Sequence, residues 1–144
     1  MTVSLVNNFR SNLKTQLEAR SNLSGVKIFS YTPGEVLDRE FISLGNANTN
    51  IVPFTMGGQY EQQFTVTGLV FVNQVGAGDL VAEATNDRAV ALLDEVFQQI
   101  VSDPTVNGSV QNAELVNYRE ENGVDENGRV CTFEFEIEFT NQTL

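Results

Sequence analysis

Residues 129–140 carry a strict alternation of apolar and polar side chains. The two sets are Cys131, Phe133, Phe135, Ile137 and Phe139 at odd positions, and Thr132, Glu134, Glu136, Glu138 and Thr140 at even positions. A period of two residues predicts a β-strand with one apolar face and one acidic face. Each large apolar side chain contributes about 1.5–3 kcal/mol when it is buried, so we expect helices or a second sheet to cover that face.

Two segments have the spacing of amphipathic helices. In residues 3–20 the apolar side chains recur every four positions, and a second segment carries a stripe at spacings of three and four. These positions are Leu5, Phe9, Leu13 and Leu17 in the first segment, and Ala89, Leu92, Leu93, Val96, Phe97 and Ile100 in the second. Such positions share one face of a helix. The second helix should end at Asp103, because the residue before a proline disfavours the helical conformation.

The remaining strands are short apolar runs bounded by turn residues. We expect them at residues 26–31, 40–44, 60–73 and 110–120, with Gly45 ending the second. Residues 60–73 become apolar on both faces near their end, which favours a central place in the sheet. Two Asn-Gly pairs in residues 121–128 predict an antiparallel hairpin that joins the last two strands.

Residues 46–58 have little periodicity, contain Pro53 and end in two glycines. They form either one long loop or a poorly paired hairpin arm. A segment of this length in a compact domain often carries function. Its apolar side chains are therefore candidates for contact with a neighbouring subunit or another partner, with packing onto the core as the alternative. These residues are Ile51, Val52, Phe54 and Met56.

Together these elements predict a single α+β domain over residues 1–144. We expect a mainly antiparallel sheet of four to five strands, with both helices packed on one face and a long loop or hairpin arm in addition. A chain of 144 residues is long enough to bury a core without disulfides.

Composition excludes several kinds of chemistry. The chain has no histidine, which excludes His-based triads and imidazole metal sites. Its one cysteine, Cys131, falls on the apolar side of its strand and is expected to be a buried core residue. No other group of side chains pairs a nucleophile with a base, so we expect no enzyme, no cofactor and no metal. No apolar run approaches 18 residues and no signal peptide is evident, so we expect no membrane span.

Nineteen acidic and eight basic residues give a formal net charge of −11, which makes free nucleic acid and anionic membranes poor partners. Glu134, Glu136 and Glu138, hereafter the acidic row, concentrate part of this charge on one strand face. The row is either an ordinary solvated face or a wall of negative charge that faces a channel.

The order and spacing of several short motifs resemble the tail terminator (tail completion) proteins of long-tailed bacteriophages. The likeness spans nearly the whole chain and comprises residues 41–45 (FISLG), 57–61 (GGQYE), 88–96 (RAVALLDEV) and 103–108 (DPTVNG). The resemblance implies a virion protein, assembled in the host cytoplasm, that forms a ring at the junction of tail and neck. Such a ring, commonly a hexamer, caps the tail tube, stops its polymerisation and docks to the neck or connector.

In that setting DNA is a partner only in transit through the lumen. Six chains of charge −11 would carry about −66, and an acidic lumen would repel the DNA phosphates and let the DNA pass. The sequence shows no basic patch that would hold DNA, so such a ring would conduct the DNA without gripping it. Two alternatives remain open: another neck component, such as a head–tail adaptor or stopper, or a small acidic module that binds a ligand or peptide.

Overall fold

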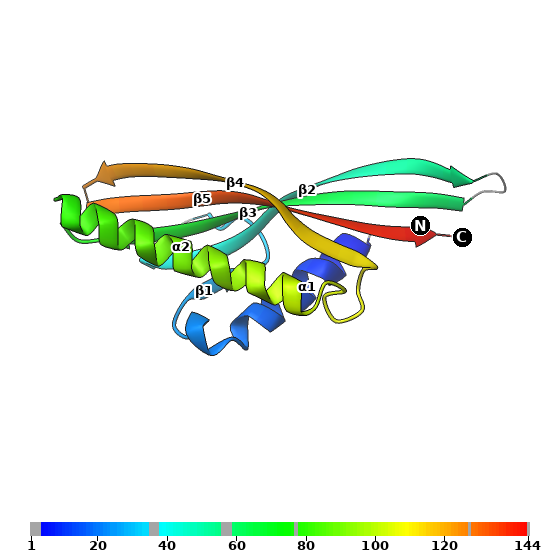
Figure 1. Cartoon of the computed structure of the whole chain (residues 1–144), viewed down its shortest axis with the longest axis horizontal. Coiled ribbons are helices and arrows are strands. Elements are labelled where there is room, and N and C mark those ends of the chain that lie inside the picture. The colour runs from blue at the N-terminus through cyan, green and yellow to red at the C-terminus, as the bar shows by residue number, and fades with distance from the viewer. Residues whose placement is uncertain (1–3, 35–37, 56–58, 77, 127, 144) are drawn as a thin grey trace.

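The computed structural model describes residues 4–34, 38–55, 59–76, 78–126 and 128–143, with side chains described except at residues 4, 50–62 and 141–143. Its elements are helices α1 (Ser4–Glu18), η1 (Ser21–Leu23, 3₁₀) and α2 (Asp79–Ser102), and strands β1 (Lys27–Phe29), β2 (Glu40–Thr55), β3 (Gln59–Gln74), β4 (Asn112–Asp125) and β5 (Gly128–Thr143). Figure 1 shows one long twisted sheet with α1 and α2 beneath the same face. The predicted α+β class is confirmed.

The described residues form a five-stranded sheet in the order β1-β2-β3-β5-β4. The short β1 pairs with β2 in parallel, and the other three pairings are antiparallel. Strand β3 lies at the centre, as its two apolar faces predicted. The hairpin between β4 and β5 is also confirmed, and its strands extend closer to the turn than expected, with Asp125 opposite Gly128.

The alternation in β5 corresponds to the two sides of the sheet. All five apolar side chains of the predicted face are buried, from Cys131 to Phe139. They pack with the buried side chains of α1, α2 and the other strands into one core cluster. Opposite Phe135, the central strand carries Gly68, where a Cβ atom would lie 2.3 Å from the ring carbon Cζ. The absence of a side chain at Gly68 therefore makes room for the Phe135 ring.

Three stacked rings join the first helix to the sheet. Phe9 of α1 stacks on Phe139 of β5 with ring centroids 4.0 Å apart, and Phe139 stacks on Phe64 of β3 at 4.9 Å. Each ring is almost fully buried. Such pairs contribute about 0.5–1.5 kcal/mol beyond the burial of their area. The stack fixes α1 under the part of the sheet from which the strands continue beyond the helices.

Strand β2 does not end at Gly45, contrary to the sequence-based expectation. The strand passes through a register shift between Leu44 and Ala47 and continues to Thr55. A Cβ atom at Gly45 would lie 2.6 Å from the backbone oxygen of Thr67, so the close approach of β2 to β3 requires glycine here. Glycine thus marks a β-bulge inside a strand and not the end of one.

Arg10 of α1 binds this bulge. Its guanidinium donates two hydrogen bonds to the backbone oxygen of Gly45, from Nη2 at 2.7 Å and from Nε at 3.2 Å. The side chain is 8% exposed, and its guanidinium lies 5.0 Å from the centre of the Tyr31 ring. One buried cation therefore ties α1, the bulge and the β1–β2 connection together.

Of the two alternatives for residues 46–58, the structure shows a hairpin arm as far as it is described. We define the arm as residues 50–55 of β2 and 59–63 of β3. Its two strands pair with each other, and residues 140–143 of β5 pair with β3 alongside. In Figure 1 these strands extend beyond both helices. The backbone hydrogen bonds of three strands make this extension part of the sheet.

Candidate functional site

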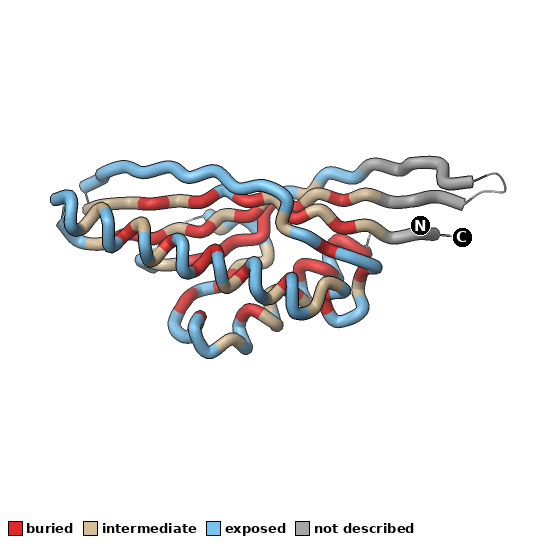
Figure 2. Tube along the Cα trace, viewed as in Figure 1, coloured by how far each residue is buried: buried red, intermediate tan, exposed pale blue. Residues whose placement is uncertain are grey.

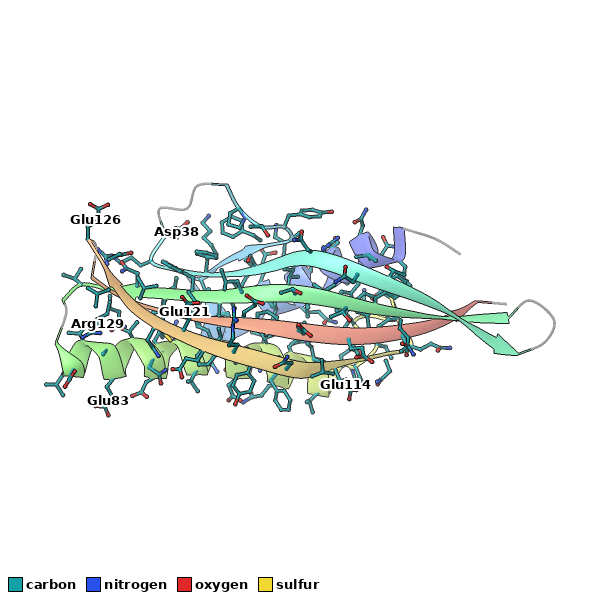
Figure 3. The ribbon with its side chains drawn as sticks, turned by 90° about the horizontal axis from the view of Figure 1, so that it is seen from above. Asp38, Glu83, Glu114, Glu121, Glu126 and Arg129 are labelled. Carbon is teal, nitrogen blue, oxygen red and sulfur yellow. The ribbon has the colours of Figure 1, made fainter. Side chains whose placement is uncertain are left out.

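The acidic row lies on the face of the sheet that the helices leave uncovered. Glu134 is exposed, and Glu136 and Glu138 are half-buried, whereas the intervening Phe135 and Ile137 are fully buried against the helices. Figure 3 looks onto this outer face, with Glu114 and Glu121 labelled along β4. The predicted separation of apolar and acidic sides is confirmed.

The neighbours of the acidic row are mostly polar or acidic. On β3 the facing residues are Leu69, Thr67 and Thr65, and on β4 they are Arg119, Asn117 and Glu114. Arg119 approaches Glu134 at 3.5 Å, but both side chains are at least half exposed, so the pair contributes little to stability. Glu114 lies directly opposite Glu138, and like charges at such positions repel. This half of the outer face is strongly negative.

The other half of the outer face carries aromatic side chains whose grouping was not predicted. Phe41 of β2 stacks on Phe71 of β3 at 4.9 Å, and Phe29 of β1 meets Phe41 edge-on at 5.9 Å. Phe41 is buried although it points away from the helices. The sequence feature that could have predicted this aromatic group is the second apolar face of residues 60–73, which contains Phe71. Among the side chains that the structure describes, the negative charge of the outer face therefore lies on β4 and β5.

The predicted contact residues of the arm fall partly outside what the structure describes. Ile51, Val52 and Phe54 belong to β2, and their side chains lie outside the described residues, as does the whole of Met56. The backbone of residues 50–55 places three of these four positions on a strand that extends past the helices. Their contact with a partner stays a prediction.

A groove between α2 and β4 was not predicted. It has a volume of about 670 Å³, and its walls combine apolar side chains with two carboxylates, Asp94 and Glu120. The apolar wall residues include Val90, Phe97, Val116 and Tyr118, which are 46%, 46%, 44% and 60% exposed. Phe97 belongs to the helical stripe that predicted core burial, but it lies at the edge of that stripe, where β4 leaves it open to solvent.

Strand β4 forms one border of the sheet and is exposed along most of its length, as Figure 2 shows. Among its residues only Ala113 is buried and only Leu115 is half-buried. An edge strand of this kind presents unpaired backbone groups that can pair with another chain. The groove and the free edge together form an exposed, partly apolar margin of the molecule.

Ion pairs fix α2 to the rest of the fold. Arg20, which follows α1, donates to Glu95 of α2 at 2.6 Å, and Asn22 donates to the same carboxylate at 2.8 Å. These hydrogen bonds, the one from Arg20 above all, lower the pKa of Glu95 below its usual value. At the other end of the sheet, Arg88 of α2 pairs with Glu40 of β2 at 2.5 Å. The groove-lining helix is thus held in one position.

Cys131 is fully buried, as predicted, and burial raises the pKa of its thiol above the usual value. A neutral, enclosed thiol is a poor nucleophile. In the described part of the chain no group of three or more Asp, Glu or Cys side chains is placed to hold a metal ion. Within the same ranges, no helix has the length and hydropathy needed to cross a membrane.

No protein-family model matches this chain, and no curated protein does. Among solved structures, the chain resembles one from the "Virion of native gene transfer agent (GTA) particle". The similarity covers 99% of this chain and 100% of that chain, with a TM-score of 0.50 and 15% sequence identity. At this identity the likeness shows the fold alone: the protein has, over its whole length, a fold similar to that of a chain from a gene transfer agent virion.

Proposed function

We propose that this protein is a virion structural protein that acts as a tail terminator. It assembles into a ring, commonly a hexamer, which caps the head-proximal end of the tail tube, stops tube growth and joins the tail to the neck or connector. The observation that carries this proposal is the whole-length likeness to a chain of a gene transfer agent virion. The order of sequence motifs, a separate observation, points to the same class.

The charge of the outer face supports a role in DNA passage. In the proposed ring, the acidic row lines or approaches the lumen, where its carboxylates repel the phosphates of passing DNA. The row lies on a face with few cations: among the described residues that pair with it across the sheet, only Arg119 is basic. A negative wall prevents the DNA from adhering, which suits a protein that conducts DNA and does not retain it.

The arm supports a role in docking. Because its strands are paired on the backbone with each other and with β5, it can extend beyond the helices as a preformed element. The aromatic stack and the contact between Arg10 and Gly45 hold its base. We assign to residues 50–63 the contact with the tube protein or the neighbouring subunit, through Ile51, Val52, Phe54 and Met56.

The proposal is tested by adding the purified protein to the tube protein of the same particle during polymerisation. Electron microscopy then measures tube length, and antibody labelling of intact tails locates the protein. We expect shorter tubes with one labelled end. Unchanged tube lengths together with label on heads alone would refute the terminator role and favour another neck component.

The arm is tested in the same assay. Replacing residues 50–63 by Asn-Gly removes both legs at once and keeps Phe64 and Phe139, so the core should remain folded. We expect this variant to be soluble and unable to cap tubes. A matched variant keeps residues 50–63 at full length and replaces Ile51, Val52, Phe54 and Met56 by serine. It shows whether capping needs these apolar side chains or only the length of the segment. Normal capping by both variants would exclude the arm from docking.

A further inference from the structure

The two edges of the sheet carry opposite charges within grooves of similar construction. One edge is the α2–β4 groove described above, with Asp94 and Glu120 in its wall. The opposite edge is β1, and a groove of about 420 Å³ between α1 and β1 is lined by two cations, Lys14 and Lys27, and one carboxylate, Glu18. Neither lysine forms a salt bridge with any residue that the structure describes.

The carboxylates of the first groove also lack a cationic partner within the described residues. Asp94 accepts a hydrogen bond from Gln98, and Glu120 accepts one from Asn86. Three of the chain's other basic side chains are already paired with carboxylates, namely Arg20, Arg88 and Arg119. In a chain of net charge −11, two lysines at one edge that form no salt bridge with a described residue are therefore a distinctive feature.

We propose that copies of this chain associate head to tail, with the β1–α1 edge of one copy seated against the α2–β4 edge of the next. The inference rests on the proposed ring and assigns its subunit interface. Lys14 and Lys27 bring positive charge to one side of the contact, and Asp94 and Glu120 bring negative charge to the other. The contact covers the exposed apolar side chains of the α2–β4 groove. Such a heterologous contact closes into a ring when its rotation permits.

Charge favours this arrangement over a twofold dimer. A β4–β4 contact would bring Asp94 and Glu120 against their own copies, and a β1–β1 contact would bring lysine against lysine. Like charges juxtaposed across an interface are strongly unfavourable. The head-to-tail contact is the arrangement of these edges in which opposite charges meet.

Strand directions are consistent with the proposal. Strand β1 runs parallel to β2, and three antiparallel pairings follow before β4, so β1 and β4 run in opposite directions. Copies related by rotation about an axis along the strands therefore bring β4 against the neighbour's β1 in the antiparallel sense. Both edges have a hydrogen-bonded neighbour on one side only in the described sheet. The contact would cover the exposed edge strand β4.

The test uses charge reversal and the mass of the assembly in solution, measured by light scattering and sedimentation at about 0.15 M salt, where screening confines charge effects to about 8 Å. One variant carries Lys14→Glu and Lys27→Glu, and the other carries Asp94→Lys and Glu120→Lys. We expect each alone to associate at least about tenfold more weakly than the wild-type chain, since like charges now meet. A 1:1 mixture, and a chain with all four changes, should recover the assembly.

A matched control places the same charge change elsewhere. Asp38→Lys with Glu83→Lys alters the net charge as much as the Asp94/Glu120 variant does, at exposed positions that line neither groove. We expect it to assemble as the wild type does. Thermal unfolding checks that every variant is folded. If one is not, zero-length carbodiimide cross-linking of mixed ¹⁴N and ¹⁵N wild-type chains should join Lys14 or Lys27 of one copy to Asp94 or Glu120 of another.

A wild-type chain that stays monomeric at every concentration, folded variants that assemble normally, or cross-links that avoid both edges would overturn the inference. The outcomes separate this interface from the proposed function. Reversed variants that still form tube-capping rings would refute the interface alone. Charge-dependent rings that leave tube length unchanged would refute the terminator role alone.

Discussion

Removal of the Arg10 side chain should weaken the fold more than removal of any exposed cation. Its guanidinium donates twice to the Gly45 oxygen and lies over Tyr31. Hydrogen bonds to a charged group contribute about 1.5–3 kcal/mol net, and a cation–π contact at an exposed ring contributes about 0.5–1 kcal/mol. Arg10→Met keeps most of the aliphatic packing, so we expect the free energy of unfolding to fall by about 2–4 kcal/mol.

Urea unfolding followed by circular dichroism measures this loss. For an m-value near 2 kcal/mol/M, the midpoint should fall by about 1–2 M. Arg119→Met is the matched control: its guanidinium is 3.5 Å from Glu134, and the two side chains are 73% and 50% exposed. Such surface pairs contribute about 0–1 kcal/mol, so this control should shift the midpoint little.

Arg10→Lys separates the charge from the geometry. A lysine keeps the positive charge but lacks the fork of N–H groups with which Arg10 binds one oxygen twice. We expect it to recover only part of the loss. Unfolding free energies for Arg10→Met and Arg119→Met that agree within about 0.5 kcal/mol, the usual range for a featureless surface substitution, would refute the idea that the bulge depends on Arg10.

Three further predictions concern the centre of the sheet, its ion pairs and its outer face. Gly68→Ala should lower the thermal midpoint, at a cost of about 1–3 kcal/mol for overpacking against Phe135, and Phe135→Leu should partly rescue it; equal stability of Gly68→Ala and wild type would contradict the close contact. Arg20 lowers the pKa of Glu95 in the folded protein. The Arg20–Glu95 pair therefore stabilises the fold fully above the pKa of an unfolded Glu, about 4.3, and this contribution is lost as the pH falls through the folded pKa. Glu95→Gln should therefore cost about 0.5–1 kcal/mol in urea unfolding at pH 7 and progressively less below about pH 4.3, and a pH-independent difference would contradict this. If the proposed ring conducts DNA, replacing the whole acidic row by lysine should keep the fold, measured by circular dichroism, and slow DNA ejection from particles. Unchanged infectivity would refute the proposed place of the row at the lumen.

The alternation in residues 129–140 was sufficient to predict which side chains of β5 are buried, because a half-buried strand requires a period of two. The helical stripes were equally informative, except at Phe97. A helix exposes the margin of its apolar stripe when the neighbouring element does not extend over it, and sequence spacing does not report that neighbour. Phe97 is open because β4 stands apart from α2 along the groove.

Gly45 shows why the bulge could not be predicted. A glycine after an apolar run indicates either the end of a strand or a bulge within it, and the choice depends on what approaches the backbone. Here the approaching groups are the Thr67 oxygen and the Arg10 side chain, which lie 22 and 35 positions away in the sequence. The opposite charges of the two sheet edges could not be predicted from the sequence for the same reason. Lys14, Lys27, Asp94 and Glu120 become groove residues only once the strand order is fixed.

The strand order also has a consequence for biosynthesis. Strand β5 follows every other element in the sequence, yet it lies between β3 and β4. While the nascent chain emerges from the ribosome, β3 and β4 therefore each lack a neighbour, and the aromatic ring of Phe139 is not yet available to Phe9. Folding of the whole sheet must therefore follow the synthesis of residues 128–143, which complete its centre.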